Sequence, residues 1–144
     1  PLHVSEVDDN LKELSPHGSF ELPVETYTGD CEIFHALYDH WHSEMEIMYI
    51  EKGSGFARLN RESIRLKKGD ILIVNCGVLH SMRTDLNNPL YYKSVVFGLG
   101  FLAGQPGDIC QECVVSPLME NRAEFCHHIE EGDSGYEKLK EIFM

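Results

Sequence analysis

A chain of 144 residues, 42% hydrophobic and 25% charged, has the length and composition of one folded domain and not of a disordered or fibrous protein. Its 24 Asp and Glu residues against 12 Lys and Arg give a formal charge of -12, which disfavours direct binding of this chain to the phosphates of DNA or RNA. No apolar run approaches the roughly 18 residues of a membrane-spanning helix, so no membrane association is expected.

The first residues and the cysteines bear on the compartment. Residues 1–9 lack the basic and then apolar pattern of a secretory signal, and five cysteines is an odd number. Both observations favour the reducing cytoplasm. The chain opens without Met and stops at Met144 inside a predicted helix, so we expect a fragment of a longer protein.

Residues 1–19 are predicted to form an N-terminal arm. They are mostly polar, with a helix-compatible stretch from Asp8 to Leu14 that ends before Pro16 and Gly18. Too few apolar side chains are present for this segment to pack by itself.

Residues 20–105 are predicted to form a β-barrel. Short runs rich in β-branched and aromatic residues alternate with turn signals such as 28–30, 52–54 and 68–70. The predicted strands are Phe20–Tyr27, Ile33–His42, Glu46–Glu51, Gly55–Leu59, Ser63–Lys67, Ile71–Asn75, His80–Thr84 and Tyr91–Phe97. Eight strands joined by short turns indicate a mainly β fold, an antiparallel jelly roll.

Residues 106–144 are predicted to be a helical segment, with helices over Leu118–His128 and from Gly135 onward. Ser134 and Glu137 have the spacing of a capping box at the second helix. Apolar side chains at helical spacing then form one stripe, Tyr136, Leu139 and Phe143. The stripe either packs on the barrel or forms a contact between two copies in a homodimer.

Residues 40–46 carry the most informative pattern of side chains. Side chains alternate between faces in a strand, so His40 and His42 point the same way, and Glu46 can join them. Two imidazoles and a carboxylate form part of a metal shell, to which His80 can add the fourth ligand. Soft ligands are absent, which leaves Zn, Ni, Fe, Mn or Cu as candidates for a divalent ion.

Alternation also selects the other residues of the predicted pocket. Tyr38 and Met48 share the parity of the histidines and glutamate, so they are expected to line the interior. Trp41 lies between the two histidines and is expected to face the opposite way.

Two segments of the chain resemble the two motifs of the cupin superfamily. The first is H-x-H-x3-E-x6-G over residues 40–53, and the second contains Gly69, Gly77 and His80. That resemblance implies a double-stranded β-helix in which His40, His42, Glu46 and His80 bind one divalent metal. Three positions depart from the superfamily pattern, which has glycine, proline and asparagine where this chain has Phe34, Asn75 and Thr84.

A longer resemblance runs from about Phe20 to Met144. The segments 40–55, 66–75 and 78–81, followed by residues 95–102 and 115–118, are similar to the N-terminal sensor domain of AraC/XylS-type transcriptional regulators. This resemblance implies an effector-binding regulatory domain, with a small molecule in the barrel and an arm that closes over it. It also implies C-terminal helices that often mediate dimerisation, and DNA binding through a separate helix-turn-helix domain beyond Met144.

Two questions stay open at this point. The polar cluster either binds a metal or forms a metal-free pocket for an organic effector, lined by Tyr38, His40, His42, Glu46, Met48 and His80. The alternative to a regulatory module is a cupin metalloenzyme, such as a dioxygenase or isomerase, built on the same four metal ligands. We assign no catalytic residue.

Overall fold

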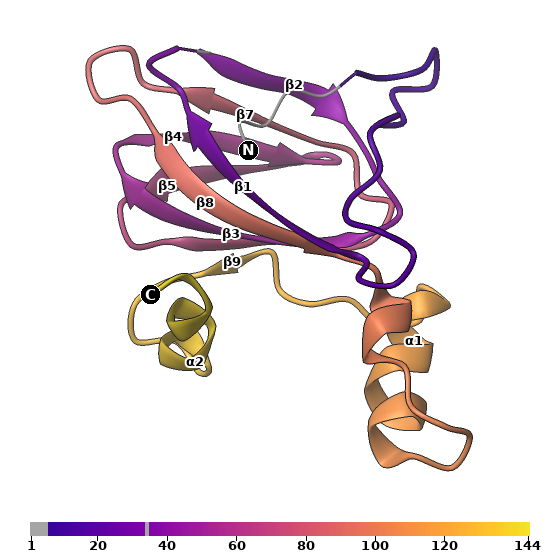
Figure 1. The fold of residues 1–144 in the computed structure, drawn as a ribbon. Helices are drawn as coiled ribbons and strands as arrows, with labels where there is room; N and C mark the ends of the chain where they lie inside the picture. Colours follow the sequence, from indigo (N-terminus) through magenta and orange to yellow (C-terminus); the bar gives the residue numbers. More distant parts are fainter. Residues whose placement is uncertain (1–5, 34) are drawn as a thin grey trace.

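Two antiparallel β-sheets pack face to face in the computed structural model, which describes residues 6–33 and 35–144 (Figure 1). One sheet has the strand order β1-β8-β3-β6-β9 and the other β2-β7-β4-β5. The barrel strands are β1 (Val24–Asp30), β2 (Ala36–His40), β3 (Met45–Lys52), β4 (Ser54–Leu59), β5 (Glu62–Lys67), β6 (Ile71–Val74), β7 (His80–Thr84) and β8 (Tyr91–Phe97). The predicted mainly β jelly roll with C-terminal helices is confirmed. The first five residues of the predicted arm and Phe34 lie outside the described residues.

Strand β3 is buried on both of its faces. It pairs with β6 on one side and β8 on the other. Met48 and Ile50 belong to the core between the two sheets, whereas Met45 and Ile47 face the C-terminal segment. Burial on both faces explains why five of the first six residues of this strand are apolar, the exception being Glu46.

The turn predicted at residues 28–30 is wrong, because β1 continues through them to Asp30. Gly29 is paired with Tyr92 of β8, and a Cβ on Gly29 would lie 1.9 Å from the Tyr92 ring. The glycine therefore makes room for a buried aromatic side chain within a strand and does not mark a turn.

The C-terminal segment runs back along the outer face of the first sheet. It contains short 3-10 and π-helical turns at Leu99–Leu102, Gln111–Val115 and Glu141–Phe143, the helices α1 (Ser116–Met119) and α2 (Tyr136–Lys140), and strand β9 (His128–Ile129). The predicted helix over 118–128 is wrong, since α1 ends at Met119 and β9 pairs with β6. No helix in the described part of the chain is long and apolar enough to cross a bilayer.

Asn75 holds this segment on the barrel. Its side-chain amide donates to the Phe125 carbonyl at 2.9 Å, and its side-chain oxygen accepts from the Phe125 N–H at 2.8 Å. These two hydrogen bonds satisfy backbone groups of residue 125 that a helix would otherwise pair. The position at which the sequence departs from the cupin proline thus fixes the irregular chain that leads into β9.

Helix α2 uses its apolar stripe within the chain. Tyr136 is buried and its hydroxyl donates to the Gly69 carbonyl at 2.7 Å, while Leu139 and Phe143 pack against the same outer core. The helix begins after Gly135, with φ of 84°, and no side chain caps it, so the capping box from Ser134 does not form. Of the two interpretations of the stripe, the structure favours packing on the barrel.

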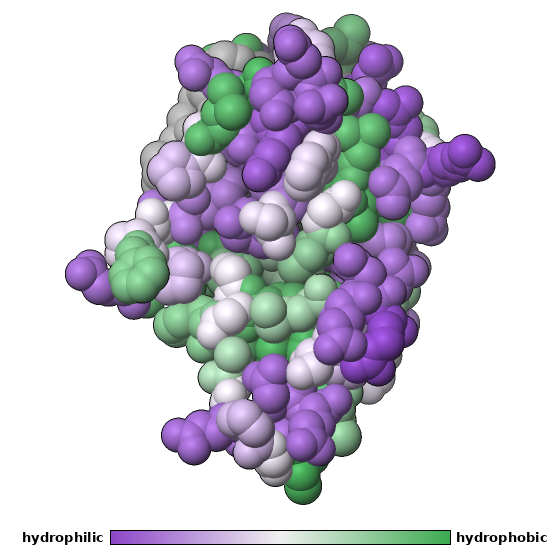
Figure 2. Space-filling view, turned by 90° about the vertical axis from the view of Figure 1, so that its right-hand side faces the viewer, coloured by the Kyte–Doolittle hydropathy of each residue, from purple (hydrophilic) through white to green (hydrophobic). Residues whose placement is uncertain are grey.

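The face of the molecule that carries α1 has an apolar band across it. Figure 2 shows green and white surface across the middle of this face, between hydrophilic regions above and below. Phe101, Leu102, Val114 and Met119 are each about half exposed. A cavity of about 310 Å³ lies between the sheet and the C-terminal segment, lined by residues that include Ile73, Leu118 and Leu139.

Residues 6–23 cross one end of the barrel without forming the helix predicted at 8–14. Asp8 accepts hydrogen bonds from the backbone N–H groups of Asn10 and Lys12, at 2.8 and 2.9 Å, and Leu11 has a φ of 63°. Side-chain bonding of this kind competes with helix formation. The segment instead makes isolated bridges, Val7 with Glu13 and Lys12 with Trp41.

Candidate functional site

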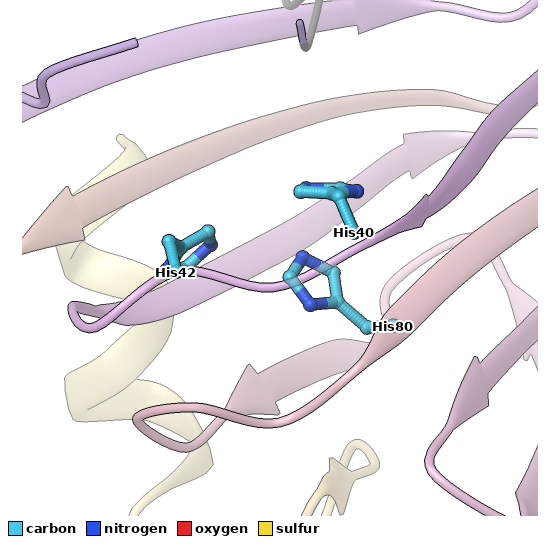
Figure 3. Close-up of side chains that lie close together, drawn as sticks. All are labelled: His40, His42 and His80. Carbon is cyan, nitrogen blue, oxygen red and sulfur yellow. The ribbon is translucent and has the colours of Figure 1, made fainter. Parts of the chain in front are cut away.

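Strand pairing brings three histidines together at one end of the barrel. His40 ends β2 and His80 begins β7, and the two are register partners in the same sheet. His42 follows two residues after the end of β2. Figure 3 shows the three imidazoles gathered around a common space, two from one segment and one from its neighbour.

Glu46 joins the histidines from β3 in the opposite sheet. Its Oε2 atom lies 3.4 Å from His42 Nε2 and 3.5 Å from His80 Nε2. The His40 and His80 ring centroids are 4.1 Å apart, and His40, His42 and His80 each offer a ring nitrogen within 4.8 Å of the others. The structure therefore brings together the four residues that the sequence singled out as metal ligands.

All four side chains are removed from solvent. His40 and Glu46 are 0% exposed, His80 2% and His42 3%. Imidazoles and carboxylates are seldom buried to this degree unless they are paired or bind a ligand. A surface cavity of about 570 Å³ opens elsewhere, beside Asn75 and Arg122, so the histidines do not lie in that cleft.

Backbone carbonyls orient the three rings. The Nδ1 atoms of His40, His42 and His80 lie 2.8, 3.1 and 2.8 Å from the carbonyl oxygens of Tyr38, Glu44 and Val78. A carbonyl only accepts, so each Nδ1 carries the hydrogen, and this leaves Nε2 to face the interior. Metal-binding histidines are commonly held in this way through the ring nitrogen that does not bind the ion.

The electrostatic surroundings differ between two of the rings. Burial, together with the charge of His80, lowers the pKa of His40 to about 4, which favours the neutral form that binds metals. Burial also acts to lower the pKa of His42, but the hydrogen bond and charge of Glu46, with the charges of Glu13 and Glu44, raise it above its ordinary value. His42 and Glu46 therefore attract a positive charge between them, either a proton or a metal ion.

The residues present fit a divalent metal. His80 Nε2 is buried and makes no hydrogen bond within the described part of the chain, so its lone pair is available to a ligand. Three imidazole nitrogens and a carboxylate are the donors that Zn, Ni, Fe and Mn sites use. Such an ion could be held by His40, His42, Glu46 and His80.

Of the two pocket residues predicted from parity, the structure places one in the interior and one outside. Met48 is buried in the core between the sheets, two residues beyond Glu46. Tyr38 is 84% exposed, so the expectation that it lines the interior is wrong. The pairing of β2 with β7 shifts register between Leu37 and His40, and such a bulge reverses the alternation on which the prediction rested.

The sequence pattern did not single out two further residues at this site, Glu13 and His17 of the arm. Both are buried, and His17 Nε2 lies 3.1 Å from Glu13 Oε2. The Tyr27 hydroxyl lies 2.8 Å from His17 Nδ1, and burial and nearby carboxylates raise the pKa of Tyr27 to about 12. The only local signal was a histidine four residues after a glutamate in an otherwise exposed segment.

Comparison with known proteins gives one family and several partial relatives. Residues 22–134 match the family described as AraC-like ligand binding domain. A relative described as an uncharacterized HTH-type transcriptional regulator, YdeC of Bacillus subtilis (strain 168), is 41% identical over 76 residues, which are 51% of this chain and 26% of the relative. An acireductone dioxygenase of Tuber melanosporum is 39% identical over 64 residues, 41% of this chain and 36% of that enzyme.

Among solved structures, a cupin protein from Bacteroides fragilis superposes with a TM-score of 0.48 and 22% identity, covering 58% of this chain and 73% of that one. The chain spans about a quarter of the length of the regulator and about a third of the dioxygenase.

Proposed function

The chain belongs to the family of AraC-like ligand binding domains, and from that premise we propose that it is the effector-binding regulatory domain of a transcription regulator. The effector is a small molecule, a divalent metal ion, or a small molecule held through such an ion, bound at His40, His42, Glu46 and His80. DNA binding belongs to a separate helix-turn-helix domain of the full-length protein, which acts as a homodimer in the cytoplasm.

One observation carries this proposal. Three imidazoles are buried with Nδ1 bonded to backbone carbonyls, and the Nε2 atoms of His42 and His80 lie 3.4 and 3.5 Å from the buried Glu46 carboxylate. Such an arrangement holds a ligand or ion in a fixed position without solvent competing for it. Met48 extends the same inner face of β3 toward the apolar core and provides an apolar contact for an organic effector.

Binding at these four residues can affect the arrangement of the arm and of the C-terminal segment. The arm lies against the histidines, and β3 passes from Glu46 to the outer core on which the C-terminal segment packs. A ligand that favours one arrangement of these segments can change the equilibrium between arrangements at a distant site. The coupling free energy between two such sites is typically about 1–3 kcal/mol. A metal bound here would supply positive charge beside Glu46; no bond in the effector has to be made or broken.

The test is a thermal-shift screen of sugars, small acids and divalent ions on metal-stripped protein without a histidine tag. We expect at least one compound or ion to raise the Tm of the wild-type chain, since ligands that bind the native state stabilise it. His42→Ala and His80→Ala should abolish that shift, whereas His35→Ala, at an exposed position, should keep it. No shift in the wild type, or the same shift in all three variants, overturns the proposal.

A cupin metalloenzyme is the second candidate. The observation that favours it is the resemblance to acireductone dioxygenases, together with a donor set that suits a catalytic metal. Oxygen uptake with an acireductone by the metal-loaded chain, lost in His80→Ala, would support the enzyme. A helix-turn-helix region encoded in the parent gene after Met144, with no oxygen uptake, would support the regulator.

A further inference from the structure

The arm places two polar side chains in the interior of the protein. The side chains of Glu13 and His17 are 1% and 2% exposed, although most residues around them on the arm are exposed. Burying a carboxylate is unfavourable unless polar partners or a cation compensate it. His17 Nε2, 3.1 Å from Glu13 Oε2, is one such polar partner.

Backbone hydrogen bonds fix the arm in register with the metal-ligand motif. The Glu13 N–H donates to the Trp41 carbonyl at 2.9 Å, and the Trp41 N–H donates to the Leu11 carbonyl at 3.0 Å. The Trp41 indole N–H also donates to the Asn10 carbonyl at 3.0 Å. Trp41 is the residue between His40 and His42, so the arm is attached at the centre of the motif.

This register brings the arm side chains to the barrel histidines. Glu13 Oε2 lies 3.9 Å from His40 Nε2, and the His17 ring centroid is 5.1 Å from that of His42. Glu13, His17 and His42 each offer a ligand atom within 4.8 Å of the others. His42 thus belongs both to this arm cluster and to the cluster with His40 and His80.

We infer that the arm completes the cation site, with Glu13 as a ligand supplied from outside the barrel and His17 as the residue that positions its carboxylate. The inference rests on the proposed function, because it assumes that His40, His42, Glu46 and His80 bind a divalent ion. It adds that the ion joins two parts of the chain.

The enlarged ligand set has a chemical consequence. Three imidazoles with two carboxylates offer at least five donors, and five or six donors suit Mn, Fe, Co or Ni better than a four-coordinate structural Zn site. Glu13 is therefore a residue that determines metal preference as well as affinity.

Titration of the whole metal-stripped chain with Co²⁺, followed by calorimetry and visible absorption, tests the inference. Glu13→Gln preserves the shape of the side chain and removes its charge; Glu6→Gln makes the same change at an exposed arm position. We expect Glu13→Gln to weaken Co²⁺ binding about 10-fold or more and to change the absorption spectrum of the bound ion. Glu6→Gln should change neither.

The positioning role of His17 has a different signature. His17→Phe should weaken Co²⁺ binding but leave the spectrum of the saturated complex unchanged, because the ligand set is the same. A changed spectrum would contradict a positioning role and make His17 itself a ligand.

Proteolysis of the wild-type chain gives a readout that does not depend on any variant folding. Lys12 is exposed on the arm, so trypsin should cleave there more slowly when Co²⁺ is bound. Unchanged cleavage overturns the inference, as does wild-type Co²⁺ affinity in Glu13→Gln. If either result is found but His80→Ala still abolishes Co²⁺ binding, the arm inference is wrong and the proposed function stands. If the wild-type chain binds no Co²⁺, the proposal that the barrel binds a metal is wrong too.

Discussion

His40 and His80 face each other across the pairing of β2 and β7, with ring centroids 4.1 Å apart. Register partners in an antiparallel sheet point their side chains to the same face, so two imidazoles far apart in the chain become neighbours inside the barrel. Burial and the charge of His80 lower the pKa of His40 to about 4. The two buried imidazoles are thus suited to binding a ligand, but their desolvation lowers the stability of the ligand-free fold.

Replacing His80 with an apolar residue of similar size should separate binding from stability. His80→Leu removes a desolvated imidazole whose neighbours include Leu59 on β4, so we expect the free energy of unfolding of metal-free protein to stay within about 1 kcal/mol of wild type or to rise. Ligand- or metal-induced stabilisation should be lost. Urea denaturation in the presence of a chelator measures the first effect, and His80→Ala, which leaves a cavity, should be about 2 kcal/mol less stable than His80→Leu. The reverse order would contradict this account.

Two glycines with positive φ should respond differently to alanine. At Gly53 (φ 84°) a Cβ would lie 2.0 Å from the Pro89 carbonyl oxygen, whereas at Gly77 (φ 71°) it would meet nothing within 4 Å. Gly77→Ala should lower the free energy of unfolding by about 1–2 kcal/mol through backbone strain alone. Gly53→Ala should lower it by about 3 kcal/mol or more, because the loop before β8 must also move. If chemical denaturation gave the same loss of stability for both variants, the loop at Pro89 would be able to move away from residue 53 at little cost.

Asn75→Ala should loosen the C-terminal segment. It removes two hydrogen bonds to the backbone of Phe125 and leaves those backbone groups without this partner, so we expect a loss of about 2 kcal/mol. Hydrogen exchange should accelerate at residues 125–129 more than in β3. Asn87→Ala, at an exposed position, is the matched control and should change neither property.

The free energy of unfolding at acidic pH should depend on Asp85. The side-chain hydrogen bond from Arg65, followed by the one from Ser54, lowers the pKa of Asp85 below its ordinary value. The native state therefore favours the ionised carboxylate, and the resulting stabilisation is present above the ordinary pKa and is lost as the pH falls through the lowered one. Asp85→Asn should reduce the loss of stability between about pH 5 and pH 2. Parallel profiles for the two proteins would show that the exposed Arg65 pair contributes nothing measurable.

Four of the five cysteines should fall into two classes toward a thiol reagent. Cys110, Cys113 and Cys126 are exposed, whereas burial raises the pKa of Cys31 to about 11. Because the thiolate is the reactive form, the three exposed thiols should react quickly near neutral pH and Cys31 only after unfolding. Rapid labelling of Cys31 in native protein, located by mass spectrometry, would indicate local opening between β1 and β2.

The local sequence determined the eight barrel strands and the histidine-glutamate motif. Both follow from short-range rules: alternation in strands, glycine at turns and the spacing of His40, His42, Glu46 and His80. The family features in the same segments reinforced the prediction, so the fold class and the four convergent side chains were predictable.

Only the tertiary structure decided where Tyr38, Gly29, Asn75 and Glu13 would act. The bulge in β2 turns Tyr38 outward, the Tyr92 ring keeps Gly29 inside a strand, and Asn75 replaces a predicted helix with an irregular segment. Glu13 reaches the histidines because backbone bonds tie the arm to Trp41. In each case a contact between residues distant in the chain outweighs a local preference of at most about 1 kcal/mol per residue, and such contacts leave no periodic signal in the sequence.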